Sequence, residues 1–309
     1  MRLTFECPDC RAPVDVESRP DVAAPRCCVC GRRFAFADGI VRVRVAAEGI
    51  PDYPPELYAL LVGVEDRHFW FGVRNEIVLS IMRAVGCVPG ETALDVGCGT
   101  GFVLRGLEAA GLVGCGIDMH LTGLRHARRR VSGLLFQDTA ARLPFTAQFD
   151  WVLLCDVVEH ADDDVALLRQ AGRAAKVDGH VLVTVPALPA LWSVYDEAIG
   201  HKRRYTRATL ARAMREAGLV PSVVRYFNAA TVPIELFRRR LVMRRRSPAD
   251  VDGALRSAVR LPPGPVNGLL RLVALAELRL ARLRLPFGSS LIAVGRRQRS
   301  TVSTHSFAE

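Results

Sequence analysis

Two patterns of apolar and polar positions alternate through the middle of the chain. Short apolar runs recur at 93–96, 112–117, 134–136, 151–155 and 181–185. Between these runs, apolar residues return every three or four positions, which is the period of an amphipathic helix. Buried strands that alternate with such helices are typical of a parallel sheet with helices on both faces. We therefore expect a doubly wound α/β core over residues 91–230.

A glycine-rich turn follows the first apolar run. Gly97, Gly99 and Gly101 occupy every second position, Asp95 lies just before them, and a helical pattern begins at Phe102. Glycine suits this turn because the backbone needs positive φ and because a ligand has to approach the backbone closely. The helix that follows offers free N–H groups to a polar ligand. The strand, turn and helix together predict a ligand site at the carboxyl end of the strand.

An acidic residue after the second apolar run narrows the choice of ligand. Asp118 ends that run, at the position where a doubly wound nucleotide site places the carboxylate that binds ribose hydroxyls. A nicotinamide fingerprint would have a glycine where Phe102 stands, so a dinucleotide enzyme is the weaker alternative, beside a plain αβ turn. The Gly-x-Gly-x-Gly spacing with Asp95 upstream resembles the first motif of the class I S-adenosylmethionine-dependent methyltransferases, over about residues 65–230.

The resemblance implies a Rossmann-like sheet of seven strands and S-adenosyl-L-methionine as the cofactor. It assigns the cofactor site to seven residues: Asp95, Gly97, Gly99, Gly101, Asp118, Asp138 and Asp156. Asp138 closes the third strand, where the family binds the adenine amino group. Asp156 follows the fourth strand, whose carboxyl end faces both the cofactor and the methyl acceptor in the resembled family.

The protein itself performs little covalent chemistry in methyl transfer, because in-line positioning of the acceptor provides most of the rate. A hydroxyl acceptor would still need a base, and the candidate catalytic residues are His160 and His201. His201 lies in a polar loop after the fifth strand, where the resembled family binds acceptors, and Asp196 is placed to orient it. The alternative is that both histidines only line the pocket or support the loop.

Four cysteines near the N-terminus form a second pattern. Cys7 and Cys10 are separated by sixteen intervening residues from Cys27 and Cys30, which is the spacing of a tetrahedral zinc ribbon. Two disulfides are the alternative, and they are disfavoured in a reducing compartment. The segment from Cys27 to Ile40 also resembles the small zinc-ribbon partners of methyltransferases. We expect structural zinc in a module spanning residues 1–46.

Residues 47–90 read as a linker followed by an N-terminal helical cap. The cluster around His68, Trp70 and Arg74 supplies candidate lid residues over the cofactor, as in the resembled family. The alternative is that its aromatic side chains simply pin two helices to the sheet.

Positive charge is concentrated in the C-terminal third of the 309-residue chain. Its net charge is +10, yet residues 201–300 hold 22 Lys or Arg against 5 Asp or Glu, which is +17 and leaves −7 for the remainder. This asymmetry predicts contact with a phosphate, a nucleic acid or a membrane surface, or else an arginine-rich solvated face. No window of about 18 uncharged apolar residues and no signal-peptide pattern occurs, so we expect a cytoplasmic protein.

Residues 231–296 hold a helical insertion and the last strand, and 297–309 read as a disordered tail. The insertion contains two basic amphipathic patterns, at 232–246 with two arginine triplets and at 266–285 with an apolar stripe. Such helices are typical of an anionic membrane surface, here the inner membrane; a helical cap over the substrate cleft is the alternative.

Taken as an enzyme, the chain is predicted to methylate a small-molecule or lipid-like acceptor on oxygen, nitrogen or carbon. An RNA methyltransferase is an alternative, because some ribosomal RNA methyltransferases carry an N-terminal zinc ribbon and a basic chain suits phosphate. The arginine triplets lack interleaved aromatic residues for base stacking, which disfavours it. A non-catalytic adaptor that binds the cofactor is a further alternative, against which the intact acids and glycines argue. The oligomeric state is not indicated by the sequence.

Overall fold

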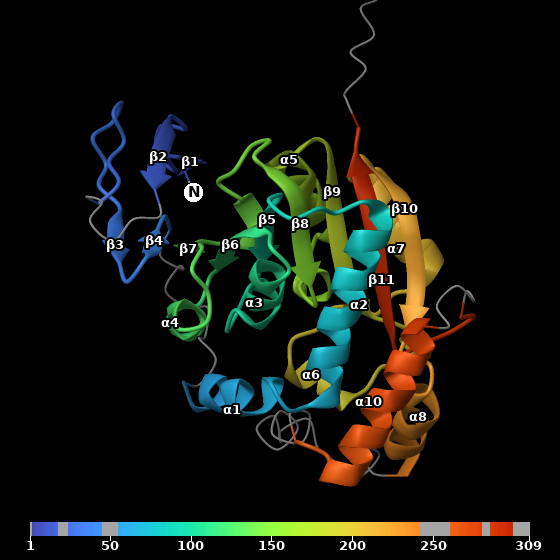
Figure 1. Cartoon of the computed structure of the whole chain (residues 1–309). Coiled ribbons are helices and arrows are strands. Elements are labelled where there is room, and N and C mark those ends of the chain that lie inside the picture. The colour runs from blue at the N-terminus through green and yellow to red at the C-terminus, as the bar shows by residue number, and fades with distance from the viewer. Residues whose placement is uncertain (1, 18–23, 45–54, 242–259, 280–284, 299–309) are drawn as a thin grey trace, which may run out of the picture.

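A nine-stranded sheet with helices on both faces forms the centre of the molecule (Figure 1). The computed structural model describes residues 2–17, 24–44, 55–241, 260–279 and 285–298. Across the sheet the strands run β10 (Leu219–Phe227), β11 (Ser290–Arg297), β9 (Ala175–Pro186), β8 (Phe149–Cys155), β5 (Thr92–Val96), β6 (Val113–Asp118), β7 (Leu134–Gln137), β4 (Ile40–Arg42) and β3 (Ala35–Ala37). A separate hairpin joins β1 (Arg2–Glu6) to β2 (Pro13–Glu17).

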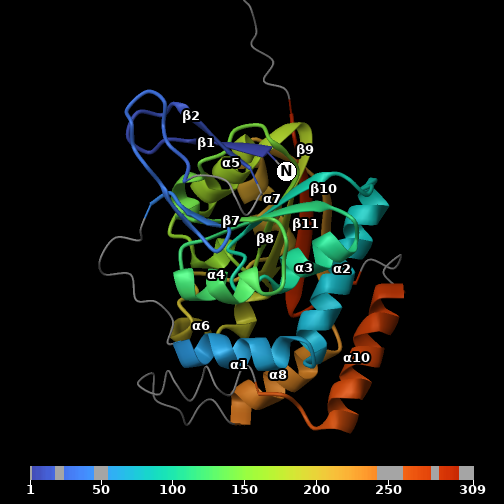
Figure 2. The same cartoon turned by 60° about the vertical axis from the view of Figure 1, so that its left-hand side comes forward.

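The helices connect these strands or precede them. In chain order they are α1 (Pro55–Glu65), α2 (Phe69–Val85), α3 (Phe102–Ala109), α4 (Leu121–Arg128), α5 (Asp164–Ala174), α6 (Val194–Ala198), α7 (Arg207–Glu216), α8 (Thr231–Leu241) and α10 (Gly264–Arg279). Within the described ranges, three short 3-10 turns lie among them: η1 (Ala140–Arg142), η2 (Val158–His160) and η3 (Pro189–Leu191). Figures 1 and 2 show α1, α6, α8 and α10 together at the end toward which the arrow of β8 points.

Seven of the strands form the predicted α/β sheet. Strands β5 to β9 are parallel, and β11 lies antiparallel between β9 and β10. The chain order reverses at β5, which pairs with β6 on one side and β8 on the other. In an open parallel sheet the ligand crevice forms at the carboxyl ends of the strands beside such a reversal. The predicted sheet class is therefore confirmed, and its topology places the site after β5, β6 and β8.

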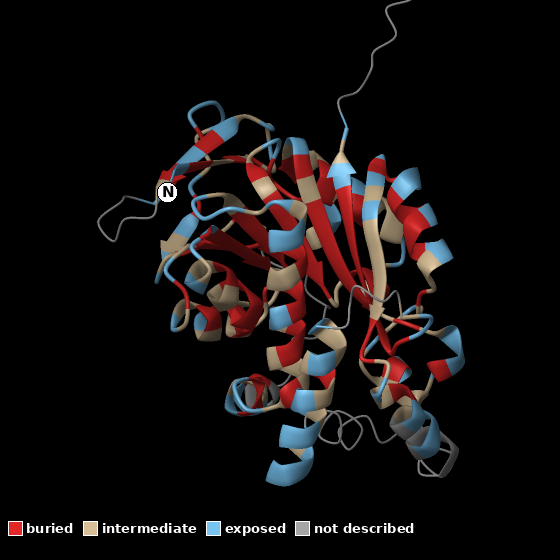
Figure 3. Cartoon of the chain, turned by 45° about the vertical axis from the view of Figure 1, so that its right-hand side comes forward, coloured by how far each residue is buried: buried red, intermediate tan, exposed pale blue. Residues whose placement is uncertain are grey.

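The central strands of the sheet are buried along most of their length (Figure 3). Their side chains belong to two apolar cores, one on each face of the sheet. Leu94 and Val152 face the core that contains α5 and α7. Ala93 and Leu153 face the opposite core, which contains α2, α3 and α4. Because both faces are covered, the central strands read as continuous apolar runs in the sequence, which is why their positions could be predicted.

The N-terminal segment is built into the sheet, which the sequence pattern did not indicate. Strand β4 pairs in parallel with β7, so that Val41 lies opposite Phe136, and β3 forms the edge of the sheet. Phe5 of the hairpin packs edge-on against Phe34 and Phe136, with ring centroids 4.9 and 5.8 Å apart. An ion pair of 2.6 Å between Arg173 and Glu6 joins α5 to the hairpin. The N-terminal segment and the α/β core thus share one apolar interior.

Helices α8 and α10 confirm that a helical insertion precedes the last strand. Asn267 of α10 fastens the start of α2, because its side chain accepts from Phe69 N at 2.9 Å and donates to Arg67 O at 2.8 Å. Ala274 is buried against the core, whereas the side chains of Leu269 and Leu272 are 61% and 67% exposed. Val266 and Leu269 of the predicted apolar stripe therefore lie exposed on α10.

Several sequence predictions fall on residues that lie outside the described ranges. They concern the linker at 45–54, the arginine triplet at 244–246, the end of the second basic helix at 280–284 and the tail from 299. The side chains of the first triplet, 238–240, are also outside the description. Among the helices that are described, none combines the length and the apolar character that crossing a membrane requires.

Candidate cofactor and acceptor site

The glycine turn after β5 has the backbone conformation that its sequence predicted. Gly97, Gly99 and Gly101 have φ of +70°, +51° and +77°. A Cβ on Gly97 would stand 2.6 Å from a methyl group of Val157, so the turn and the loop after β8 can touch only because position 97 lacks a side chain. At Gly99, by contrast, no atom of the described chain lies within 4 Å of the Cβ position. The turn is thus packed at one glycine and open to a ligand at the next.

Asp118 lies at the end of β6, beside this turn, as the ribose-binding role requires. Its carboxylate accepts from Gly99 N and from His120 N, both at 2.8 Å. These two backbone bonds fix the carboxylate at the carboxyl edge of the sheet, which is where a nucleotide site of this fold binds ribose hydroxyls.

Asp95 lies under the turn and is 2% exposed. Burial raises the pKa of this carboxyl to about 7, with Arg74 opposing the shift and Asp118 adding to it. Its Oδ2 atom has no hydrogen-bond partner among the described residues. A buried carboxylate oxygen without a partner is costly, so a cationic group of a ligand would satisfy it. S-adenosylmethionine carries such cationic groups, and the residues present therefore fit this cofactor.

Asp138, the predicted adenine-binding acid, is held by a residue of the N-terminal segment. Arg44 Nη1 donates to its two carboxylate oxygens at 2.9 and 3.2 Å and to Arg142 O at 2.8 Å. Burial raises the pKa of Asp138 to about 6, although Arg44 opposes the shift. Sequence reasoning missed Arg44, since nothing in the local pattern shows that β4 would lie beside β7.

The predicted lid and the acid after β8 meet directly. Arg74 of α2 pairs with Asp156 Oδ2 at 2.5 Å, and its guanidinium lies over the ring of Trp70, 4.8 Å from the centroid. Asp156 has a φ of +58° and also accepts from Thr184 at 3.2 Å. His68, in contrast, is the N-cap of α2 and accepts from Trp70 N at 3.2 Å. Of the lid candidates, Arg74 and Trp70 are thus brought to the site, while His68 starts the helix.

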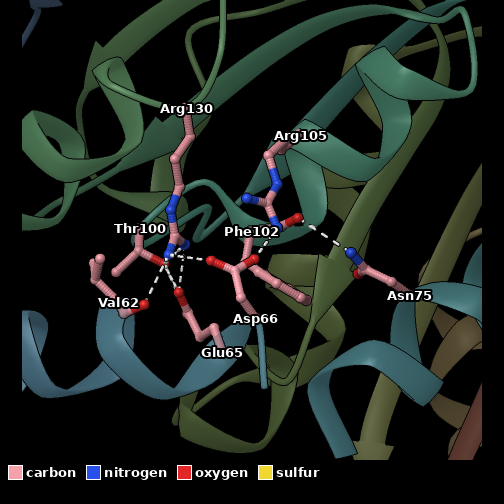
Figure 4. A network of polar contacts seen from close by, with 8 residues as sticks. All are labelled: Val62, Glu65, Asp66, Asn75, Thr100, Phe102, Arg105 and Arg130. Carbon is pink, nitrogen blue, oxygen red and sulfur yellow. Dashed lines mark hydrogen bonds and ion pairs between the residues drawn. The ribbon is translucent and has the colours of Figure 1, made fainter. Parts of the chain in front are cut away.

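A polar network that the sequence did not predict ties α1 to the glycine turn (Figure 4). Thr100 donates to both carboxylate oxygens of Glu65, at 2.7 and 2.8 Å, and Arg130 forms an ion pair with the same carboxylate. Arg130 also donates to Val62 O at 3.2 Å. The side chains of Glu65, Thr100 and Arg130 are largely buried. This network fixes the position of the glycine turn relative to α1.

The two predicted catalytic histidines lie together after β8 and α6. Their ring centroids are 4.8 Å apart. His201 Nδ1 is 2.9 Å from Asp196 Oδ1, and that carboxylate oxygen also accepts from Arg204 Nε at 2.7 Å. Burial opposes ionisation of Asp196, yet the bonds from His201 and Arg204 lower its pKa to about 2. Asp196 therefore stays ionised and orients the ring of His201, as the sequence had predicted.

Glu159 adds a third group to this cluster and was not predicted as a site residue. It is fully buried, and its Oε1 lies 3.7 Å from Nε2 of His201. Neither carboxylate oxygen has a hydrogen-bond partner within the described part of the chain. Burial, followed by the nearby charge of Asp156, raises the pKa of Glu159. Burial, followed by His201, lowers the pKa of His160 to about 4, so that ring is neutral at pH 7.

The four predicted zinc ligands also come together. The sulfur atoms of Cys7 and Cys30 are 3.6 Å apart and those of Cys10 and Cys27 are 3.4 Å apart; all four cysteines are free. Four sulfurs at about 2.3 Å from one zinc ion would lie roughly 3.8 Å from one another, so the cluster fits that ion. Backbone N–H groups, that of Cys30 first, lower the pKa of Cys27 to about 6, which favours the thiolate that zinc binds. Cys28 is exposed and outside the cluster.

Residues 69–222 match the family described as a methyltransferase domain. The ubiquinone biosynthesis O-methyltransferase of Alkalilimnicola ehrlichii is 30% identical over 109 residues, which are 33% of this chain and 44% of that protein. The chain thus spans about half the length of the curated relatives it matches.

Solved structures are similar over more of the chain. One is a chain of the complex between the Haloferax volcanii Trm112 methyltransferase activator and a methyltransferase, with a TM-score of 0.51, 21% identity and coverage of 79% of this chain and 95% of that one. Another is a phosphoethanolamine N-methyltransferase of Haemonchus contortus with bound S-adenosylhomocysteine, with a TM-score of 0.52, 17% identity and coverage of 80% and 59%. At these identities the likeness concerns the fold.

Proposed function

We propose that this chain, a class I S-adenosylmethionine-dependent methyltransferase, methylates an oxygen atom of a small-molecule acceptor that binds over His160 and His201. The observation that carries the proposal is the position of the cluster of Glu159, His160 and His201, which follows β8 and α6 at the edge of the sheet where the glycine turn ends β5. The matched relatives that are named as O-methyltransferases support oxygen as the acceptor atom.

When bound, S-adenosylmethionine supplies a methyl group that its sulfonium already activates. Asp118 would hold the ribose and Asp138 the adenine amino group, while the unpaired oxygen of Asp95 would meet a cationic part of the cofactor. Arg74 on Asp156 would keep the lid helix α2 closed over the reacting groups and exclude water. These residues bind and orient the reactants, which is how a methyltransferase provides most of its rate.

The acceptor oxygen would form its new bond to the methyl carbon as the carbon–sulfur bond breaks, with the electron pair of the broken bond left on sulfur. The hydroxyl proton leaves the acceptor in the same overall reaction. His201 is better placed than His160 to receive it, because Asp196 orients its ring and the pKa of His160 is lowered to about 4. A general-base role for either histidine remains a prediction.

We also propose that Cys7, Cys10, Cys27 and Cys30 hold one zinc ion. Their sulfur positions and the lowered pKa of Cys27 support this ligand set. Zinc would stiffen the segment that places β4 beside β7 and Arg44 on Asp138. Through that arginine, the metal would act on cofactor binding from outside the site.

An anionic membrane surface is a further proposed partner. The outward-facing apolar side chains of Leu269 and Leu272 on α10 support it, together with the positive balance of residues 201–300. A lipid-like acceptor would then reach the site from that surface.

A labelled-methyl experiment tests the main proposal. The full chain is incubated with methyl-labelled S-adenosylmethionine and cell extract, and lipid, RNA and small-molecule pools are separated. Label is expected in an organic-soluble or small-molecule product with a methyl ether. Label found only in RNA, or no transfer by a protein that binds S-adenosylhomocysteine, would contradict the proposal.

A further inference from the structure

Three potential metal-binding side chains converge where the acceptor is proposed to bind. Glu159 and His160 lie on η2, directly after β8, and His201 lies in the loop after α6. One ligand atom from each residue falls within 4.8 Å of the other two. Three ligands about 2.1 Å from a tetrahedral ion lie roughly 3.4 Å apart, so side-chain rotations that bring these atoms closer together would complete the geometry.

The unpaired carboxylate of Glu159 points to a missing cation. Glu159 is completely buried, and neither of its oxygens accepts a hydrogen bond from any described residue. The nearest potential partner is Nε2 of His201, at 3.7 Å. A buried carboxylate is tolerated when it is protonated, paired with a charge or bound to a metal. The site therefore has a place for positive charge that the described residues leave unfilled.

The hydrogen bonds of His201 favour a metal in that place. Its Nδ1 lies 2.9 Å from Asp196 Oδ1, which also accepts from Arg204, and its Nε2 lies on the side of Glu159, 3.7 Å from Oε1. A proton on Nδ1 satisfies the contact with Asp196 and leaves the lone pair of Nε2 for another partner. Histidines that bind metals commonly donate their other ring N–H to a carboxylate in this way. Asp196 is itself held by Arg204 and by Ser193, whose hydroxyl donates at 3.0 Å. The ring of His160 lies beside that of His201, with centroids 4.8 Å apart, and offers a ring nitrogen to the same place.

We propose that Glu159, His160 and His201 bind one divalent transition-metal cation, whose open positions take the oxygen atoms of the acceptor. Two imidazoles and one carboxylate suit Zn²⁺, Mn²⁺ or Fe²⁺ better than Ca²⁺, which prefers oxygen ligands alone. Three protein ligands leave at least one position for a further ligand. The role of this cation in acceptor binding rests on the proposed methyl transfer, whereas its binding does not.

The Nε2 atom of His201 can either bind the cation or accept a proton, but it cannot do both. A metal on Nε2 of His201 occupies the lone pair that would otherwise take the hydroxyl proton. In that case the cation would attract electrons from the acceptor hydroxyl and make loss of its proton easier, and the proton would pass to solvent water without a histidine accepting it. Removal of the cation should then stop methyl transfer while cofactor binding remains.

Metal binding is measured on the full chain with zinc already in the four-cysteine cluster. Mn²⁺ and Zn²⁺ are titrated separately, with electron paramagnetic resonance for Mn²⁺ and elemental analysis after dialysis for Zn²⁺. Manganese is a useful probe because soft thiolate ligands do not favour it. We expect one additional ion per chain, and binding that is at least tenfold weaker in Glu159→Gln. Asp196→Asn should also weaken it by about tenfold or more, because the orienting carboxylate is lost.

Glu216→Gln is the matched control, because Glu216 lies on the exposed side of α7 and pairs only loosely with Arg212 at 3.8 Å. All variants should bind S-adenosylhomocysteine as the wild type does, which shows that they are folded. The inference is overturned if the folded wild type takes up neither ion beyond the zinc of the cysteine cluster, or if Glu159→Gln and Glu216→Gln bind the ions equally. If the ion binds but no acceptor is methylated in the extract experiment, the metal site stands and the proposed function fails.

Discussion

The cofactor half and the acceptor half of the site are built in different ways. In the cofactor half, the turn and its acid come from one strand–turn–helix–strand unit, and Gly99 meets Asp118 across 19 positions of sequence. In the acceptor half, Glu159 and His201 come from separate loops and meet only because the sheet brings β8 beside β9. The first half depends mainly on backbone conformation and the second on side chains placed by the tertiary fold.

This difference explains which parts of the site could be predicted. Glycines with positive φ and a carboxylate at a strand end leave a local pattern, so Asp95, Gly97 and Asp118 were found where they were expected. Two side chains that reach the cofactor half from distant elements left none, whereas His201 of the acceptor half was predicted from the polar loop that carries it. Arg44 contacts an acid 94 positions away, and Glu65 contacts Thr100 across 35 positions.

The largest effect is expected from loss of the zinc cluster, which would show that a distant element supports the cofactor half. Replacing Cys7 and Cys27 together by Ser should lower the stability of the N-terminal segment by several kcal/mol, since structural zinc provides folding energy. Because Arg44 then no longer holds Asp138, S-adenosylhomocysteine should bind more weakly by calorimetry.

Cys28→Ser is the control, because Cys28 is exposed and outside the cluster. It should leave both the zinc content and the affinity unchanged. Full cofactor affinity in the double variant without zinc would show that the cofactor half is self-contained.

A smaller loss is expected when the central acid of the cofactor half is removed. Asp118→Ala should weaken S-adenosylmethionine binding by roughly 2–4 kcal/mol, because charge-assisted bonds to the ribose and the bond to Gly99 N are lost. Asp163→Ala also removes a carboxylate that accepts a backbone N–H, but at the start of α5, and should leave affinity unchanged. Equal affinity of Asp118→Ala and wild type, measured by calorimetry, would refute the ribose assignment.

More of the fold than of the site could be predicted from the sequence, for a related physical reason. Continuous apolar runs mark the buried parallel strands, and these gave the positions of β5 to β9 because each run is local. The pairing of β4 with β7 joins two segments about 95 residues apart, and neither segment has a sequence feature that identifies the strand it pairs with. The outward orientation of Leu269 on α10 was likewise decided by how Asn267 and Ala274 dock the helix, not by its periodicity.

The raised pKa of Asp95 predicts a pH dependence of both protein stability and cofactor affinity. Its pKa is raised to about 7 in the folded protein and is about 3.9 when unfolded. The folded protein therefore binds more protons between these values, and stability falls as pH rises from about 4 to 7. A cationic ligand group needs the carboxylate, so cofactor affinity should fall by up to about tenfold, or 1.4 kcal/mol, for each pH unit below 7.

Calorimetry in buffers of different ionisation enthalpy should show a proton released on binding at pH 6. Asp95→Asn should remove the greater part of this release, leaving the smaller contribution of Asp138, whose pKa is raised to about 6. An unchanged proton release in Asp95→Asn would show that Asp95 does not meet the cationic part of the cofactor.

The smallest expected effect concerns the surface near the acceptor half. If α10 lies on an anionic membrane, vesicles that contain anionic lipid should bind the chain, and added salt should weaken the electrostatic part of about 1 kcal/mol for each nearby arginine. Leu272→Ser should weaken vesicle binding by about 1 kcal/mol, roughly fivefold, because its exposed side chain would enter the interface. Val88→Ser, also at an exposed apolar position but in the loop after α2, should have no effect. Equal binding to neutral and anionic vesicles, or equal binding by the two variants, would contradict the membrane proposal. The acceptor would then reach the site from solution.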